Sequence, residues 1–249
     1  MLTPSEASAA IASTLLPLEP EPCALGAAAG RVLREDLVAE RDQPPFDRVA
    51  MDGIGLSHGA WSAGRRAFRI LGVAPAGREP PSLTDDSGCI EVMTGAMRPS
   101  GTDCVVPVEL YEVRDGVAFL RDEPVTPAAH IHGQGTDRRA GEPVLLTGTR
   151  LRGPELAIAA SVGRGTLCVS RRPRLAVIST GDELVPPGVD PQPWQVRRSN
   201  AYGIAALLQS AGYSNLADDH APDDPQRLRA TLARHLAERD VLVLSGGVS

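Results

Sequence analysis

Two short apolar segments near the carboxyl end constrain the fold of this chain more than any other feature. Residues 175–179 read Leu-Ala-Val-Ile-Ser, and residues 240–245 read Asp-Val-Leu-Val-Leu-Ser. Continuous apolar runs of this kind are typical of parallel strands that are buried on both faces. Two helix-spaced segments, at about 200–209 and 225–238, lie between them, together with a weaker strand near Leu216. This order predicts a parallel βαβ sheet over residues 173–249.

Capping residues predict where the two helices begin and end. Ser199 or Asn200 precedes the first helix and Gly212 follows it, while Asp223-Asp224-Pro225 begins the second. The sequence then closes on Gly246-Gly247-Val248-Ser249, a Gly-rich turn of the kind that leads from a parallel strand into a helix. We therefore expect an incomplete three-layer α/β domain, and a chain that is a piece of a longer protein.

The first 172 residues show a different order of predicted helices and strands. Thr3-Pro4-Ser5-Glu6 is a capping box that predicts a helix to about Leu16. A strand near residues 37–39 and a strand–helix–strand pattern over residues 143–169 frame a central region of short β-segments. A hairpin turn is expected at Arg114-Asp115-Gly116. The expected segments of the central region are 67–73, 89–93, 104–107, 108–113 and 117–120.

These patterns predict a multidomain protein of α/β and β structure. A discontinuous first domain would comprise residues 1–40 and 141–172, and its helix at 3–16 is a candidate to pack on the α/β domain. A β-rich domain, residues 41–140, would be inserted into it. Arg171-Arg172-Pro173 marks the boundary to the α/β domain at residues 173–249.

Composition excludes some classes of function. The 249 residues are 42% hydrophobic and carry a formal net charge of -6, which is typical of a globular chain and argues against a nucleic-acid or membrane-surface role. The sequence contains neither a run of roughly 18 apolar residues that could span a membrane nor a signal-peptide pattern. Four widely separated cysteines indicate buried thiols in a reducing, cytoplasmic compartment: Cys23, Cys89, Cys104 and Cys168.

The strongest candidate site follows the two buried strands, because open parallel sheets bind ligands at the carboxyl ends of their strands. Ser179-Thr180-Gly181-Asp182-Glu183 follows the first strand, and Ser245-Gly246-Gly247-Val248-Ser249 follows the second. Small, Gly-containing loops let backbone N–H groups approach a phosphate. Asp182 and Glu183 at the same mouth suit a phosphate that carries Mg²⁺, or the hydroxyls of a ribose or pterin. The alternative is that both loops are plain strand-to-helix connections.

A second candidate is the loop Pro44-Pro45-Phe46-Asp47-Arg48-Val49-Ala50-Met51-Asp52-Gly53. Its prolines fix one end and Asp52-Gly53 predicts a turn at the other, so the loop can hold a carboxylate in place. Thr94-Gly95 follows a predicted strand and offers a hydroxyl and a free backbone N–H, while Asp137 lies in a Gly-flanked turn. Each of these motifs alone also fits an ordinary turn.

Histidine and arginine side chains add weaker candidates. His130 and His132 would share one face of a strand, but spacing places no third metal ligand beside them. The other three histidines resemble surface residues: His58, His220 and His235. Two pairs of arginines are the best basic candidates for an anion, although a solvated linker explains them equally well: Arg171, Arg172, Arg197 and Arg198.

Taken together and in order, the motifs resemble those of the molybdopterin molybdenumtransferase family, the MoeA family, to which the E domain of gephyrin is also similar. The resemblance covers essentially the whole chain. Three departures, at Val49, Ile54 and Glu91, replace a small polar residue, a Tyr and a basic residue. Glu91 makes the strand before Met-Thr-Gly-Ala less basic, which weakens the expected affinity for an oxyanion. The matching motifs are Pro-Pro-Phe-Asp…Ala-Met-Asp-Gly at 44–53, Met-Thr-Gly-Ala at 93–96, Pro-x-Gly-x-Asp at 99–103, Gly-x-Asp at 135–137, Ser-Thr-Gly-Asp-Glu-Leu at 179–184, Asp-Asp at 223–224 and Ser-Gly-Gly-Val-Ser at 245–249.

The resemblance implies an enzyme of molybdenum cofactor biosynthesis that inserts molybdate into adenylylated molybdopterin, with Mg²⁺ and release of AMP. It also implies a cytoplasmic homodimer, with the active site between the α/β domain of one protomer and the β-rich domain of the other. The molybdopterin adenylyltransferase is a further candidate partner. A non-catalytic molybdopterin-binding or dimerising scaffold module is the alternative function, and the choice between molybdate and tungstate stays open.

Roles for individual residues also come from the resemblance. The chemistry would fall to Asp52, Thr94 and Glu183. Metal binding would fall to Asp182 and Glu183 with Asp223 or Asp224. The substrate would be held by residues of two Gly-containing loops and one further acid: Asp137, Ser179, Thr180, Gly181, Ser245, Gly246, Gly247 and Ser249.

Overall fold

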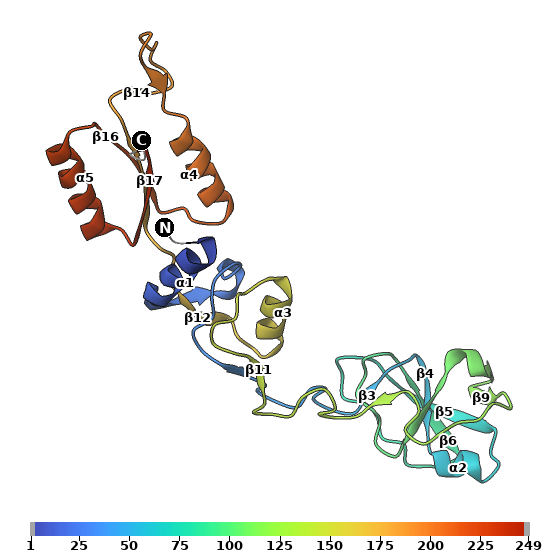
Figure 1. The fold of residues 1–249 in the computed structure, drawn as a ribbon. Helices are drawn as coiled ribbons and strands as arrows, with labels where there is room; N and C mark the ends of the chain where they lie inside the picture. Colours follow the sequence, from blue (N-terminus) through green and yellow to red (C-terminus); the bar gives the residue numbers. More distant parts are fainter. Residues whose placement is uncertain (1–2, 247–249) are drawn as a thin grey trace. The chain divides into compact units, whose positions relative to one another are not determined.

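A computed structural model describes residues 3–246 of the chain, and its ribbon is drawn in Figure 1. Contacts divide the chain into two compact units. One unit comprises residues 1–36 and 146–249, and the other comprises residues 37–145. The β-rich segment is thus inserted between two pieces of the first unit. We call residues 37–145 the insert, and residues 173–246 of the other unit the α/β body.

The α/β body contains the parallel sheet that the apolar segments predict. Strand β13 (Leu175–Thr180) lies between β16 (Leu216–Ala221) and β17 (Val241–Ser245), and both neighbours run parallel to it. Every residue of β13 is buried, as expected of a central strand. Helices α4 (Asn200–Ser210) and α5 (Pro225–Glu238) lie on opposite sides of the sheet (Figure 1). The strands, the helices and their parallel arrangement are therefore confirmed.

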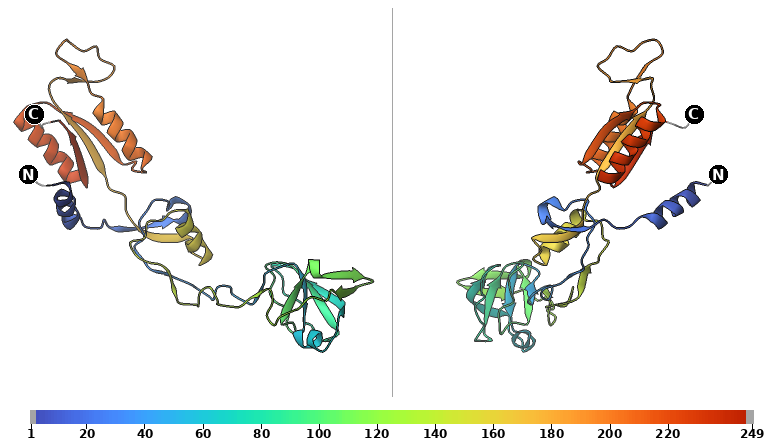
Figure 2. Two further views of the ribbon diagram at one scale, coloured as in Figure 1. Left: turned by 45° about the vertical axis from the view of Figure 1, so that its right-hand side comes forward. Right: turned by 90° about the vertical axis from the view of Figure 1, so that its left-hand side faces the viewer.

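The predicted helix ends of the α/β body are confirmed with small differences. Asp224 caps α5, because its carboxylate accepts the backbone N–H groups of Gln226 and Arg227 at 3.1 and 2.7 Å. Gly212 follows α4 with a φ of +90°, the left-handed conformation that ends a helix. A two-residue parallel pair, β14 (Leu184–Val185) with β15 (Val196–Arg197), was not predicted, because two residues show no period. The loop between them extends beyond the start of α4 in both views of Figure 2.

The unit that contains the α/β body also has a smaller part, made of residues 3–36 and 146–172. Helix α1 (Pro4–Thr14) begins with the predicted capping box, in which the Glu6 carboxylate accepts the Thr3 N–H at 2.7 Å. Strand β1 (Pro20–Ala24) pairs antiparallel with β12 (Thr166–Ser170), so the two sequence pieces of the unit meet in one sheet. The one-turn helix η1 (Leu25–Ala27) and helix α3 (Gly153–Ser161) contact each other beside them.

The insert is built on a six-stranded sheet of order β7-β4-β6-β5-β9-β8. The strands are β4 (Gly53–Leu56), β5 (Ala67–Ala74), β6 (Gly88–Val92), β7 (Cys104–Pro107), β8 (Tyr111–Arg114) and β9 (Val117–Leu120). Shorter elements complete it: β2 (Leu37–Val38) with β11 (Pro143–Leu145), β3 (Arg48–Val49) with β10 (Ile131–His132), α2 (His58–Ser62) and η2 (Val108–Leu110). The β-rich prediction is confirmed.

Two expectations for the insert are wrong. Gly53 does not close a turn; it opens β4, where a Cβ would lie 2.0 Å from the Val106 carbonyl oxygen. Glycine is needed there because the backbones of β4 and β7 approach closely. Since glycine is disfavoured in strands, its presence led the sequence to predict a turn instead. Val108–Leu110 forms the short helix η2 and not the start of a strand, so β8 begins only at Tyr111.

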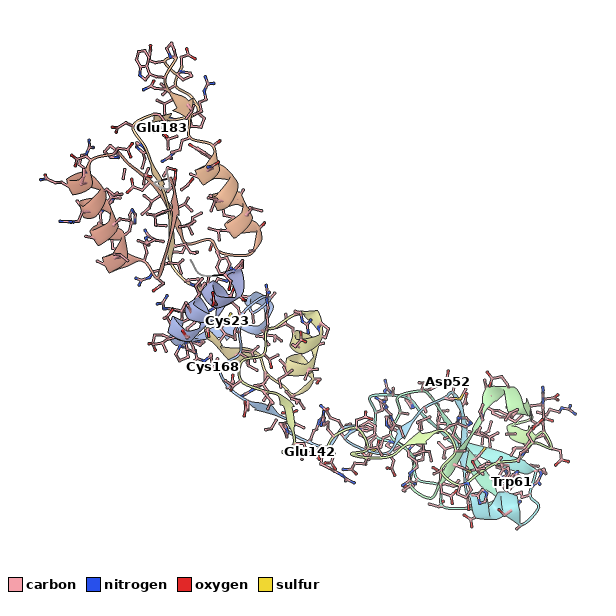
Figure 3. All side chains as sticks on the ribbon, in the orientation of Figure 1. Cys23, Asp52, Trp61, Glu142, Cys168 and Glu183 are labelled. Carbon is pink, nitrogen blue, oxygen red and sulfur yellow. The ribbon has the colours of Figure 1, made fainter. Side chains whose placement is uncertain are left out.

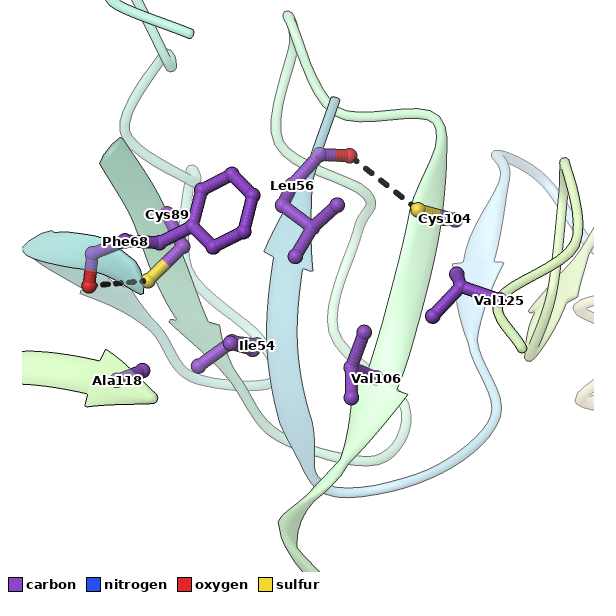
Figure 4. Close-up of a cluster of buried hydrophobic side chains, with 8 residues drawn as sticks. All are labelled: Ile54, Leu56, Phe68, Cys89, Cys104, Val106, Ala118 and Val125. Carbon is purple, nitrogen blue, oxygen red and sulfur yellow. Dashed lines mark hydrogen bonds between the residues drawn. The ribbon is translucent and has the colours of Figure 1, made fainter. Parts of the chain in front are cut away.

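The core of the insert explains two of the cysteines. Phe68 and Leu56 pack with Ile54 and Val106, and Cys89 and Cys104 fill the space between them (Figure 4). Burial raises the pKa of both thiols to about 12, so they stay protonated and serve as small apolar side chains.

Candidate functional site

A cavity of about 210 Å³ lies at the carboxyl ends of β13 and β17, where α4 begins. We call it the strand-end pocket. Ser179 and Ser245 sit side by side in the register of the two strands, and Asn200, the first residue of α4, donates its side-chain N–H to Ser245 Oγ at 3.1 Å. The structure therefore brings together the two loops that the sequence singled out. The lining residues are Ser179, Leu184, Val196, Arg197, Arg198, Ser199, Asn200 and Ser245.

Three polar atoms at or beside this pocket lack partners. Ser179 Oγ, Thr180 Oγ1 and Arg198 Nε are buried and make no hydrogen bond to any residue from 3 to 246. Ser179 is 1% exposed and Thr180 is 8% exposed. An unpaired buried polar group costs about 1–3 kcal/mol, so native proteins rarely keep one without a ligand or water to satisfy it. Three together indicate a site built to receive an acceptor-rich ligand.

The amino terminus of α4 adds to this capacity. Ser199 precedes the helix, but its side chain caps none of the first-turn N–H groups. Those N–H groups and the positive end of the helix dipole favour an anion. Arg198 reaches the same place with its side chain only 13% exposed, and it is held on the other side by the Asp218 carboxylate. The pocket thus has positive charge and free donors at one point.

Glycine is required at two positions beside the pocket. Gly181 has a φ of +137°, and a Cβ there would lie 2.3 Å from Glu183 Oε2. Gly246 has a φ of +119°, and its Cβ would lie 2.4 Å from Thr180 Oγ1. Both backbone conformations are rarely open to other residues. Gly247 and Ser249 were also expected here, but they lie outside the described residues.

The acidic candidates near the strand ends separate into two roles. Asp182 and Asp223 accept each other's backbone N–H at 3.2 and 3.4 Å, which places the two exposed carboxylates beside each other. Asp224 instead caps α5. The Glu183 carboxylate lies over Gly181, and Figure 3 shows it near β14. Within residues 3–246, no three His, Cys, Asp or Glu side chains form a ready metal cage.

One histidine, His220, contacts the Gly181 loop, and no local pattern predicted this contact. The His220 ring nitrogen Nε2 lies 2.8 Å from the Gly181 carbonyl oxygen, and its neighbour Asp219 contacts His235 at 2.9 Å. His235 is buried, and His220 and His58 are half-buried, so the expectation that all three lie on the surface is wrong. Pairing across β13 and β16 places His220 opposite Ser179, which only the sheet register could have shown.

In the insert, Asp52 and Thr94 form what we call the Asp52 corner. Asp52 Oδ1 accepts both the backbone N–H and the hydroxyl of Thr94, at 2.7 and 2.6 Å. These two bonds lower the pKa of Asp52 below its ordinary value of 3.8. The N–H of Gly95 donates to the Val49 carbonyl at 2.8 Å. The expectation of a free N–H at Thr94-Gly95 is therefore wrong, because both groups are bonded within the insert.

The rest of the motif loop is fixed by Asp47, which the sequence analysis noted but did not choose as a site residue. Its carboxylate accepts the Gln134 N–H at 2.9 Å and pairs with Arg98 at 3.0 Å. The bond from Gln134 is the main cause of a lowered pKa for Asp47. Asp137 lies 3.0 Å from the His132 ring. The loops at 44–53 and 133–137 are thus joined within the insert.

All four arginines proposed for an anion have a partner in the fold, and that of Arg198 is Asp218. Arg171 makes two bonds to Asp240, at 2.6 and 2.8 Å, and these bonds together with those from Arg174 hold the pKa of Asp240 well below its ordinary value. Arg172 donates to the Gly212 carbonyl, and Arg197 lies 3.6 Å from Asp190. Among the four, Arg198 alone lines the strand-end pocket with a buried, unpaired nitrogen.

Comparison with known families gives two matches. Residues 2–163 match the family described as "MoeA N-terminal region (domain I and II)", and residues 176–249 match the "Probable molybdopterin binding domain". Together the two matched segments span nearly all of the chain. The strand-end pocket lies in the second segment, and the Asp52 corner lies in the first.

Similar proteins carry related names. Molybdopterin molybdenumtransferase of Synechocystis sp. is 41% identical over 221 residues, which cover 88% of this chain and 57% of that protein. Molybdopterin molybdenumtransferase 2 of Mycobacterium tuberculosis is 36% identical over 226 residues, covering 89% of this chain and 56% of that protein. The crystal structure of a molybdopterin biosynthesis moeA protein from Pyrococcus horikoshii is similar at a TM-score of 0.81 and 28% identity, covering 93% of this chain and 62% of that one.

The chain spans a little over half the length of these curated relatives. Among residues 3–246, no helix is long and apolar enough to cross a bilayer.

Proposed function

This chain belongs to the MoeA family, and from that membership we infer that it takes part in molybdenum cofactor biosynthesis as a molybdopterin molybdenumtransferase. The proposed reaction inserts molybdate into adenylylated molybdopterin and releases AMP. We also propose three domains. The first is discontinuous and comprises residues 1–40 and 141–172, the second is the inserted β-rich domain at 41–140, and the third is an incomplete three-layer α/β domain at 173–249.

One observation carries the proposal: the strand-end pocket combines unpaired Ser179 and Arg198 atoms with the amino terminus of α4. A phosphate group on the pterin satisfies all of these donors at once, because its oxygens accept hydrogen bonds from hydroxyl, guanidinium and backbone N–H groups. Gly181 and Gly246 let the Glu183 carboxylate and Thr180 lie against the backbone of the loops beside the pocket. We expect the pterin phosphate to bind here.

The carboxylates Asp182 and Asp223 fit the Mg²⁺ that the proposed reaction uses. They stand side by side, and Mg²⁺ is commonly held by one or two carboxylates together with substrate phosphates. When bound, the ion would offset negative charge on the phosphates as AMP leaves. Glu183 lies next to this pair and keeps its proposed catalytic role. Asp224 is better placed as a helix cap than as a metal ligand.

The insert would supply the remaining groups. Asp52 keeps one carboxylate oxygen free beside its bonds to Thr94, and Asp137 is exposed, so both can meet a substrate or an oxyanion. The proposed assembly is a cytoplasmic homodimer, in which the insert of one protomer serves the α/β body of its partner. The molybdopterin adenylyltransferase is the proposed donor of the adenylylated substrate.

Mg²⁺- and molybdate-dependent AMP release from adenylylated molybdopterin tests the proposal on this 249-residue chain. We expect release that is lost in Asp52→Ala and Glu183→Ala and kept in Asp86→Ala, a matched exposed carboxylate of the insert. Binding of the adenylate without release would instead support the non-catalytic binding module. Neither release nor binding would contradict the proposed function of this chain.

A further inference from the structure

A second cavity, of about 230 Å³, lies away from the strand-end pocket, where β1 and β12 meet the start of the α/β body. Four arginines line it, and none of its lining residues is acidic: Arg31, Arg150, Arg171 and Arg172. Such a concentration of guanidinium groups is unusual in a chain whose formal net charge is -6. We call it the arginine cavity.

Two of the four charges are compensated within the protein. Arg31 pairs with Glu21 and also donates to the Ser170 carbonyl, with its side chain only 10% exposed. Arg171 pairs with Asp240 through two bonds. These pairs fix the guanidinium groups in position, as bidentate and buried contacts do.

The other two charges are not compensated by a carboxylate. Within the described residues, Arg150 makes neither a side-chain hydrogen bond nor an ion pair, and Arg172 donates only to the Gly212 carbonyl. That carbonyl lies at the carboxyl end of α4, whose dipole disfavours an anion, but Arg172 already offsets it. Two uncompensated cations beside two fixed ones leave the cavity short of about two negative charges.

We propose that the arginine cavity binds a tetrahedral dianion, either a free inorganic oxyanion or the phosphate of a phosphomonoester. Arg150 and Arg172 would donate hydrogen bonds to the anion. Arg31 and Arg171, which come from the two sequence pieces of this unit, would line the cavity beside it. The site is independent of the proposed molybdopterin function, since it shares no lining residue with the strand-end pocket.

Calorimetric titration with inorganic phosphate tests this site in an Arg198→Gln background, which weakens anion binding at the strand-end pocket. We expect one site whose affinity falls about tenfold or more in Arg150→Gln, because a charge-assisted bond is lost. Arg172→Gln should weaken it similarly. Arg229→Gln, an exposed arginine on α5, should leave the affinity unchanged.

Ribose 5-phosphate in a parallel titration separates the two sources of the anion. Tighter binding than phosphate would identify a phosphomonoester site, and equal or weaker binding would identify a free oxyanion site. The proposal is overturned if the background chain binds no phosphate, or if Arg150→Gln and Arg172→Gln bind it as well as Arg229→Gln does. Since the exposed Arg150 side chain makes no hydrogen bond or ion pair with residues 3–246, its variant should fold normally, which circular dichroism would verify.

Discussion

The Asp52 corner and the strand-end pocket both follow a strand and both present a hydroxyl, yet their polar groups are in opposite states. Thr94 gives its hydroxyl and its N–H to one carboxylate oxygen of Asp52. Ser179 and Thr180 keep buried hydroxyls that make no hydrogen bond to any described residue. A satisfied corner holds its shape without a ligand, whereas an unsatisfied pocket gains most of its hydrogen bonds when a ligand arrives. From this comparison we infer that the pocket binds the substrate, and that the corner presents a carboxylate whose position is already fixed without ligand.

The largest expected effect is on stability, and it comes from adding a side chain at Gly53, the first residue of β4, directly after Asp52. Gly53→Ala should lower the free energy of unfolding of the insert by about 3 kcal/mol, because the new Cβ meets the Val106 carbonyl within a paired strand. Chemical denaturation would measure it, with Gly26→Ala as the control, since a Cβ at Gly26 meets nothing within 4 Å. Equal stability of the two variants would show that β4 can shift away from β7.

The second effect concerns ligand affinity at the pocket. Arg198→Gln should weaken molybdopterin binding by roughly ten- to a hundredfold, because a hydrogen bond from a charged donor contributes about 1.5–3 kcal/mol. Fluorescence titration would measure the dissociation constant. Arg229→Gln is the matched control on the same α/β body. Unchanged affinity in Arg198→Gln would mean that its unpaired nitrogen does not face the ligand.

A smaller effect compares how much the hydroxyls of Thr94 and Ser179 contribute to stability. Thr94→Val removes a bonded hydroxyl and should lower stability by about 1 kcal/mol, whereas Ser179→Ala removes an unpaired one and should leave stability unchanged or slightly higher. Thermal unfolding of the ligand-free chain would compare them. If Ser179→Ala were the more destabilising of the two, its hydroxyl would have a partner in the fold and the comparison would fail.

The smallest effect is the pH dependence of the corner. Bonds from Thr94 lower the pKa of Asp52 in the folded state, so their stabilisation is complete above the ordinary value of 3.8 and disappears as the pH falls through the lowered value. The Thr94 amide proton should therefore titrate in an NMR series with a midpoint below 3.8. Asp52→Asn should abolish that transition. A midpoint at or above 3.8 would show that the bonds do not form in solution.

The sequence predicted those parts of the molecule that local chemistry determines. Asp224 and Pro225 mark the start of α5, and the unbroken apolar run 175–179 marks a strand buried on both faces; the structure has both. The motif loops at Ser179 and Ser245 were also singled out, because the carboxyl ends of parallel strands converge.

The parts that were missed depend on contacts between distant residues. Gly53 belongs to β4 because β7 approaches its backbone, which no local preference records. His220 reaches the Gly181 carbonyl through the pairing of β16 with β13, and the buried His235 has its Nε2 2.9 Å from the Asp219 carboxylate on β16. Sequence could not separate Arg198 from the other three arginines; what separates it is a buried Nε at the strand-end pocket that has no hydrogen-bond partner among residues 3–246.

The most direct test of the account compares the pocket and the corner in one calorimetric titration of molybdopterin into this chain. Ser179→Ala and Asp52→Asn each change one side chain, one at the unsatisfied pocket and one at the satisfied corner. We expect Ser179→Ala to weaken binding about fivefold, through loss of about 1 kcal/mol of hydrogen bonding, and Asp52→Asn to leave it unchanged. Weaker binding in Asp52→Asn with full affinity in Ser179→Ala would contradict the account, because the corner and not the pocket would then hold the ligand.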